Sequence, residues 1–212
     1  MYKPRSGERR VRTLDTAWVE RAVAEHLARY SCTRAHLRTL IDRRIRKAAR
    51  EGGVIQPDLM EQLDVVLERH VGLGTLNDAA WAEMKARSLT RRGVGKALVA
   101  QRLRQEGIPD ARPALDVVAE ELQGSDEEEL VPDIVAACAW ARRKRVGAFA
   151  REAEEVPEPT DRGAARAARD ATRAAEQKVL AAMGRAGFSY QLARRVLELS
   201  REEAEELLFR LR

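Results

Sequence analysis

Three potential zinc ligands lie close together in the first part of the sequence. His26, Cys32 and His36 carry the nitrogen and sulfur donors that zinc prefers in proteins. No fourth donor follows at a spacing typical of a zinc site, and Tyr30 and Ser31 interrupt the helical pattern between the two histidines. We therefore predict that these side chains have packing or surface roles and that the protein holds no metal.

Other motifs of enzyme chemistry are incomplete. Gly93-x-Gly95 lacks the third glycine and the preceding strand that a phosphate-binding loop needs, so it predicts a turn between helices. No Ser-His-Asp set and no pair of carboxylates stands out. The sequence therefore predicts a protein that is not an enzyme and uses no cofactor.

Basic side chains are the residues best suited to chemistry here, because they can bind an anionic partner. The chain has 39 Lys and Arg residues against 34 Asp and Glu residues, which gives a formal net charge of +5. Between Glu83 and Glu106 there are seven basic residues and no acidic residue. The candidate contact residues form three clusters: Arg43, Arg44, Arg46 and Lys47; Lys85, Arg87, Arg91, Arg92, Lys96, Arg102 and Arg104; and Arg142, Arg143, Lys144 and Arg145.

Clustered cationic side chains attract nucleic acid and acidic protein surfaces. The acidic residues are concentrated in residues 120–129, 152–158 and 198–206, which allows a basic face to exist beside acidic edges. The alternative is that the arginines form solvated helix faces balanced by nearby glutamates. Residues 85–104, which contain no acid, fit that alternative least well.

The elements that position these residues are predicted to be helices. Aromatic residues make up only 4% of the chain and charged residues 34%, so the core is expected to be thin and built of Leu, Val and Ala. Ala, Leu, Arg and Glu favour helices and dominate the chain, whereas alternating strand patterns are nearly absent. The tryptophans Trp18, Trp81 and Trp140 lie on apolar helix faces, which favours core packing over base stacking. We predict an all-α fold.

A repeat organises the helices. Leu-Asp-Val-Val occurs at residues 63–66 and again 52 residues later, and each copy follows a glycine and an apolar residue, Gly53-Val54 and Gly107-Ile108. A degenerate third copy begins at Gly187-Phe188. We predict a basic flexible arm over residues 1–13 and three helical repeats over residues 14–72, 73–124 and 125–212, with an acidic insert containing prolines near residues 152–171.

Cysteine use and hydropathy indicate the compartment. Cys32 and Cys138 are far apart and are expected to be free thiols in a reducing cytoplasm. The longest apolar run, residues 134–141, is much shorter than the roughly 20 residues of a membrane span. The first 12 residues are basic and contain no apolar signal segment. We expect a cytoplasmic monomer with no membrane partner.

Several segments together resemble the RecX family, the regulators of the RecA recombinase. The central pattern of that family is similar to residues 76–82 here, Leu-Asn-Asp-Ala-Ala-Trp-Ala, although Trp81 stands where phenylalanine is usual. Residues 30–37 resemble the family's first repeat, with His36 in place of a glutamate, and Gly187-Phe188-Ser189 matches its last repeat. Further matches are Arg87, Gly93, Gly95, Leu103, Gly107 and Ile108.

The resemblance implies three tandem three-helix repeats in an elongated, curved molecule without catalytic activity. It implies binding to RecA and to its filament on single-stranded DNA, which restrains filament extension, ATP hydrolysis and strand exchange during recombination, DNA repair and the SOS response. DNA itself, single- or double-stranded, is a further partner to consider.

Two other functions fit the same pattern. Three-helix units with a basic helix also describe helix-turn-helix proteins that bind DNA without RecA. Such proteins usually use one recognition helix and a dimer interface, whereas several similar basic helices recur in this chain. A helical scaffold for some other acidic protein remains the third alternative.

Overall fold

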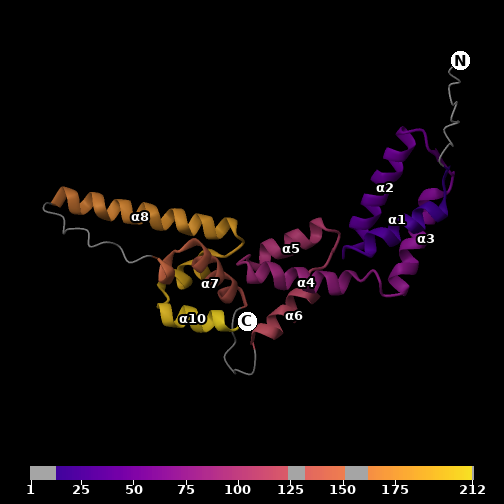
Figure 1. Ribbon diagram of the computed structural model, residues 1–212. Coiled ribbons are helices and arrows are strands. Elements are labelled where there is room, and N and C mark those ends of the chain that lie inside the picture. Colours follow the sequence, from indigo (N-terminus) through magenta and orange to yellow (C-terminus); the bar gives the residue numbers. More distant parts are fainter. Residues whose placement is uncertain (1–12, 124–131, 151–161, 212) are drawn as a thin grey trace, which may run out of the picture. The chain divides into compact units, whose positions relative to one another are not determined.

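The computed structural model describes residues 13–123, 132–150 and 162–211. These residues form ten α-helices, one short 3-10 helix and two two-residue strands, which confirms the prediction of an all-α protein (Figure 1). The helices are α1 (Thr16–Leu27), α2 (Arg34–Arg50), α3 (Leu59–Gly72), α4 (Asp78–Arg91), α5 (Lys96–Gln105), α6 (Arg112–Gln123), α7 (Pro132–Lys144), η1 (Gly147–Phe149), α8 (Arg162–Arg185), α9 (Tyr190–Glu198) and α10 (Arg201–Phe209).

Some predicted segments are only partly covered. Residues 1–12 of the predicted basic arm and residues 152–161 of the predicted insert lie outside the described residues. The remainder of the insert belongs to helix α8. The chain divides into two compact units, Met1–Trp81 and Ala82–Arg212, and the division into three repeats stays a prediction.

The first unit is built from α1, α2 and α3, which pack on one another. Asp15 and Thr33 cap the starts of α1 and α2, because their side-chain oxygens accept hydrogen bonds from the backbone N–H groups of the third residue of each helix, Trp18 and His36. The apolar side chains at helical spacing, such as Leu37, Ile41 and Leu63, are completely buried. The first unit thus has a continuous core with a contribution from every helix.

A short parallel pairing joins the two ends of the first unit's core. Strand β1 (Thr13–Leu14) pairs with strand β2 (Val54–Ile55). Leu14 is fully buried, whereas both residues of β2 are exposed. The pairing anchors the chain before α1 to the segment that precedes α3.

Helix α7 is the centre of the second unit. Its eight residues from Ile134 to Ala141 are all buried, which explains why this stretch is the longest apolar run of the sequence. A helix that is apolar on every side needs neighbours all round it. The helices α6, α9 and α10 and the 3-10 helix η1 supply them.

The same capping device occurs once in each unit. Asp78, the first residue of α4, accepts a hydrogen bond from the backbone N–H of Arg34 at 2.7 Å, and Arg34 begins α2. Asp133 in α7 accepts from the backbone N–H of Lys96, also at 2.7 Å, and Lys96 begins α5. Each aspartate satisfies one of the N–H groups that a helix leaves without an internal partner. A helix is therefore capped by a carboxylate that comes from a later helix of the chain.

Replacing Asp133 tests this device. Burial raises the pKa of its carboxyl group, although the hydrogen bond from Lys96 opposes the rise. A raised carboxyl pKa means that the folded state disfavours the charge, so stability falls as pH rises from the ordinary value of 3.8 through the raised one. We expect Asp133→Ala to lower the free energy of unfolding by about 1 kcal/mol, because the N–H of Lys96 loses its acceptor. Asp133→Asn keeps an oxygen acceptor without the charge.

Urea denaturation near neutral pH measures both variants. We expect Asp133→Asn to stay within about 0.5 kcal/mol of the unchanged chain, since it retains the hydrogen bond and removes the partly buried charge. Equal losses in the two variants would show that the charge of Asp133, and not its hydrogen bond to Lys96, stabilises the start of α5.

Candidate basic interface

The fifteen basic residues singled out in the sequence lie on four helices and the adjoining turns. Four are on α2, three on α4, three on α5 and three at the end of α7, with Arg92 and Arg145 just after α4 and α7. All except Lys85 and Arg87 are exposed. Solvent exposure therefore does not distinguish a partner-binding residue from one that is merely solvated. The ion pairs of each side chain show whether its charge is already used within the chain.

Arg87 is committed to contacts within the chain. Its Nε lies 2.8 Å from both carboxylate oxygens of Glu121, and its Nη2 lies 2.6 Å from Glu121 Oε1. A further ion pair of 3.3 Å joins Arg87 to Glu83 one helical turn earlier. The hydrogen bond from Arg87 holds the pKa of Glu121 below its usual range. Arg87 thus links α4 to α6, and we infer that it is not a partner contact.

The other two clusters are also partly used by the fold. On α2, Arg46 pairs with Asp42 at 2.9 Å and Lys47 lies 3.9 Å from Glu51. At the end of α7, Arg143 donates a hydrogen bond to the backbone carbonyl of Arg92. The basic residues in the last turn of α7 also lie at the helix end where the helix dipole favours positive charge. Part of the charge in these clusters therefore has a structural explanation.

Five basic residues of the acid-free stretch between Glu83 and Glu106 keep their side chains exposed. In the part of the chain that the structure describes, none of their side chains forms an ion pair with a carboxylate, and the same is true of Arg43, Arg44 and the basic residues 142–145. At longer range, Arg91 helps to lower the pKa of Glu121. The five are Arg91, Arg92, Lys96, Arg102 and Arg104, and we call them the α4–α5 basic set. They come from the acid-free stretch of the sequence, so their charge is available to an external anion.

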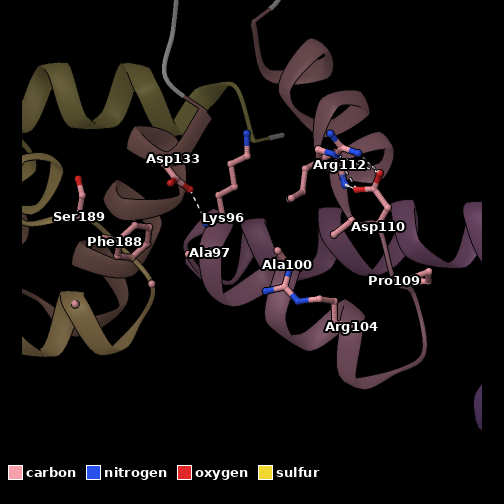
Figure 2. A pocket seen from close by; sticks show the side chains of 14 residues that line it. Lys96, Ala97, Ala100, Arg104, Pro109, Asp110, Arg112, Asp133, Phe188 and Ser189 are labelled. Atoms are coloured by element: carbon pink, nitrogen blue, oxygen red, sulfur yellow. Dashed lines mark hydrogen bonds and ion pairs between the residues drawn. The ribbon is translucent and has the colours of Figure 1, made fainter.

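An open hollow of about 840 Å³ adjoins part of this set. Lys96, Ala100 and Arg104 line it at intervals of four residues, which places them along one side of α5 (Figure 2). Arg102 does not line the hollow, because it is two positions from Arg104 and points to the other side of the helix. The small alanines of α5 leave space between the two basic side chains.

A residue that sequence reasoning missed forms the opposite wall of the hollow. The guanidinium of Arg112 binds both carboxylate oxygens of Asp110, with its Nη2 2.7 Å from Oδ2, as Figure 2 shows. This contact lowers the pKa of Asp110 to about 2. The Asp-x-Arg spacing before a helix was the available sequence signal. Asp110 neutralises Arg112, and the carboxyl group of Asp133 lines the hollow beside Lys96, whose charge opposes the rise that burial causes in the pKa of that carboxyl. Arg104 is therefore the basic side chain of the hollow that has no carboxylate partner among the lining residues.

The candidate zinc ligands do not converge. Within the described residues, no group of three His, Cys, Asp or Glu side chains is arranged to hold a metal. His26 is buried in α1, its Nε2 has no hydrogen-bond partner, and burial is the main cause of its lowered pKa. Cys32 is also buried, and burial raises the pKa of its thiol, whereas His36 is exposed.

The three tryptophans have structural roles. Trp18, Trp81 and Trp140 are all buried, which confirms core packing. Trp81 also donates a hydrogen bond from Nε1 to the carbonyl of Ser31 at 3.3 Å. Among the helices that the structure describes, none is both long and apolar enough to cross a membrane.

Comparisons with known proteins identify relatives along most of the chain. No family model matches it. The chain is 30% identical over 196 residues to a protein of Myxococcus xanthus (strain DK1622) named Regulatory protein RecX, and the match covers 92% of each chain. It is 27% identical over 192 residues to the Regulatory protein RecX of Agrobacterium fabrum, covering 91% of this chain and 88% of the relative.

A solved structure has the same fold. The crystal structure of RecX from Lactobacillus salivarius matches with a TM-score of 0.53 and 16% sequence identity, over 90% of this chain and 97% of that one. At this level of identity the match concerns the fold alone. It agrees with the helical architecture described above.

Proposed function

The chain belongs to the RecX family of regulatory proteins, and on that premise we propose that it regulates the RecA recombinase by binding RecA and its filament on single-stranded DNA. The proposed contacts are the α4–α5 basic set. The observation that carries this choice is that these five exposed side chains, which form no ion pair among the described residues, lie together in the stretch between Glu83 and Glu106 that contains no acidic residue. The remaining candidate residues, apart from Arg87, are proposed as secondary contacts.

The physical basis is electrostatic complementarity. A protein filament on DNA carries the phosphate charges of the nucleic acid, so exposed cations on a partner speed association and orient the complex. Arginine suits this role because its planar guanidinium binds carboxylate or phosphate with two hydrogen bonds. Such binding needs no catalysis. We propose that the chain acts stoichiometrically, as a cytoplasmic monomer, and inhibits filament extension, ATP hydrolysis and strand exchange.

A binding measurement tests the partner. Filaments of the cognate RecA are assembled on immobilised single-stranded DNA with a slowly hydrolysed ATP analogue, and binding of the chain is followed by interferometry. The matched reference is the same DNA without RecA. We expect binding to the filament at least about tenfold tighter than to the naked DNA, a difference of about 1.4 kcal/mol. Equal affinity for the two surfaces would instead favour a DNA-binding protein without a RecA partner.

A further inference from the structure

Helix α8 carries a row of arginines that are not among the fifteen candidate contact residues. Arg162, Arg166, Arg169 and Arg173 follow one another at intervals of three or four residues and are all exposed. This spacing places them on one side of the helix, along a line of about 16 Å. The opposite side is made of alanines, at positions 164, 167, 168, 171, 174 and 175.

Core packing does not explain this part of α8. Of the 24 residues in the helix, only Met183, close to its C-terminal end, is buried. The helix packs against α9, and in Figure 1 its N-terminal part extends away from α7 and α10. Alanine and arginine are strong helix formers, so the sequence can maintain the helix without burying it. The exposed part therefore needs another reason to carry a row of arginines.

The charges are arranged unfavourably for a helix with only a structural role. Its first turn contains no acidic residue, although negative charge is favoured at that end of a helix. Arg162 and Arg166 are four residues apart, as are Arg169 and Arg173, and like charges at this spacing repel each other. The described residues offer the row one ion pair, from Arg166 to Asp170 at 4.0 Å, with both side chains largely exposed. Such a pair contributes little.

We propose that the arginine row of α8 binds the phosphate backbone of DNA. An anionic partner would relieve the repulsion within the row, and the guanidinium group matches phosphate geometry. DNA presents the required regular line of charge, with one negative charge for about every 1.7 Å of duplex. Residues 162–178 contain no aromatic side chain for stacking on bases, so the contact is independent of base sequence. This inference does not rest on the RecA proposal.

The salt dependence of binding to naked DNA tests whether the arginine row contacts phosphates. The full chain is titrated into a labelled single-stranded 30-mer and into its duplex, between about 50 and 200 mM salt, and binding is followed by fluorescence anisotropy. We expect replacement of all four arginines by glutamine to reduce the slope of log affinity against log salt by about 2.8 for the single strand and about 3.6 for the duplex. Comparing the two probes shows which form of DNA the row prefers.

Two controls separate the row from net charge and from helix stability. Replacing the four arginines by lysine keeps the charge, so we expect the salt slope to be retained. Replacing Arg21, Arg29, Arg50 and Arg195 by glutamine removes the same charge from exposed positions elsewhere, and we expect the slope to change by less than about 1. Circular dichroism at 222 nm checks that α8 remains helical, which glutamine favours.

Two results would overturn the inference. One is an unchanged salt slope on both probes in the glutamine variant while its helicity is intact. The other is weaker binding of that variant to RecA filaments with unchanged binding to naked DNA, which would assign the row to an acidic protein surface. A chain that fails to bind RecA at all would sink the proposed function and leave the DNA result on α8 standing.

Discussion

Replacing the α4–α5 basic set by glutamine is expected to weaken binding to the RecA filament by about 50-fold to several hundred-fold at 0.1 M salt. The reason is that five exposed cations, each contributing roughly 0.5 to 0.7 kcal/mol to an anionic contact, act together. Helicity is expected to stay unchanged, because these side chains are exposed and glutamine is a good helix former. The measurement is filament binding by interferometry, with circular dichroism of the same samples.

The matched control removes the same charge from other places. Replacing Arg21, Arg29, Arg50, Arg185 and Arg195 by glutamine also lowers the net charge by five, and all five residues are exposed. We expect this variant to lose less than about fivefold in affinity. The reason is that charges away from the contact surface affect only the long-range electrostatic attraction between the chain and the filament. Equal losses in the two variants would mean that net charge, and not the position of the set, governs binding.

The second large effect is expected from Gly93, which lies between α4 and α5. Its φ of +70° is in the left-handed region, where a side chain is strained, and a Cβ atom there would lie 2.5 Å from the backbone N of Trp140. Because the obstacle is backbone of the buried helix α7, it cannot rotate away. We expect Gly93→Ala to lower the free energy of unfolding by about 3 kcal/mol or more, from backbone strain and overpacking together.

Thermal and urea denaturation measure this loss. For a chain of this size the expected fall in the melting temperature is about 6 to 12 °C. The control is Gly184→Ala in α8, where a Cβ meets nothing within 4 Å, and that change is expected to stabilise the chain by about 0.5 to 1 kcal/mol. A melting temperature for Gly93→Ala equal to that of the control would contradict the close approach of α7 to this turn.

Local sequence signals predicted the helices well. Leu37, Ile41 and Ile45 are spaced four residues apart, which predicts that they share one helix face, and all three are buried in α2. Thr33 and Asn77 are of the residue types favoured just before a helix, and both accept hydrogen bonds from backbone N–H groups at the start of α2 and α4. Such features depend on residues within one or two helical turns, so a single sequence contains the information.

Features that depend on distant residues were not predicted. The β1–β2 pairing joins two segments of only two residues each, which is too short for an alternating pattern. The capping of α5 by Asp133 joins residues 37 positions apart.

The basic residues illustrate the same limit within the candidate site. Their number and clustering are visible in the sequence, and the acid-free stretch of residues 85–104 already stands out there. Arg87 is paired with Glu121, which is 34 positions away in the chain, so its ion pair cannot be read from the local sequence. Arg102 differs from Lys96 and Arg104 because it does not line the hollow beside α5, and the hollow is known only from the structure. The sequence predicted the charge of the surface, and the fold shows which of these side chains, such as Arg46, Lys47 and Arg87, are paired within the chain.

The most direct test of the proposed RecA regulation is the rate of ATP hydrolysis by the cognate RecA on single-stranded DNA. The chain is titrated in, beginning well below one molecule per RecA monomer, at a fixed salt concentration. We predict that hydrolysis falls at these low ratios, and that the variant lacking the α4–α5 basic set needs a much higher concentration for the same effect. Full hydrolysis at equimolar amounts of chain and RecA would contradict inhibition through filament binding.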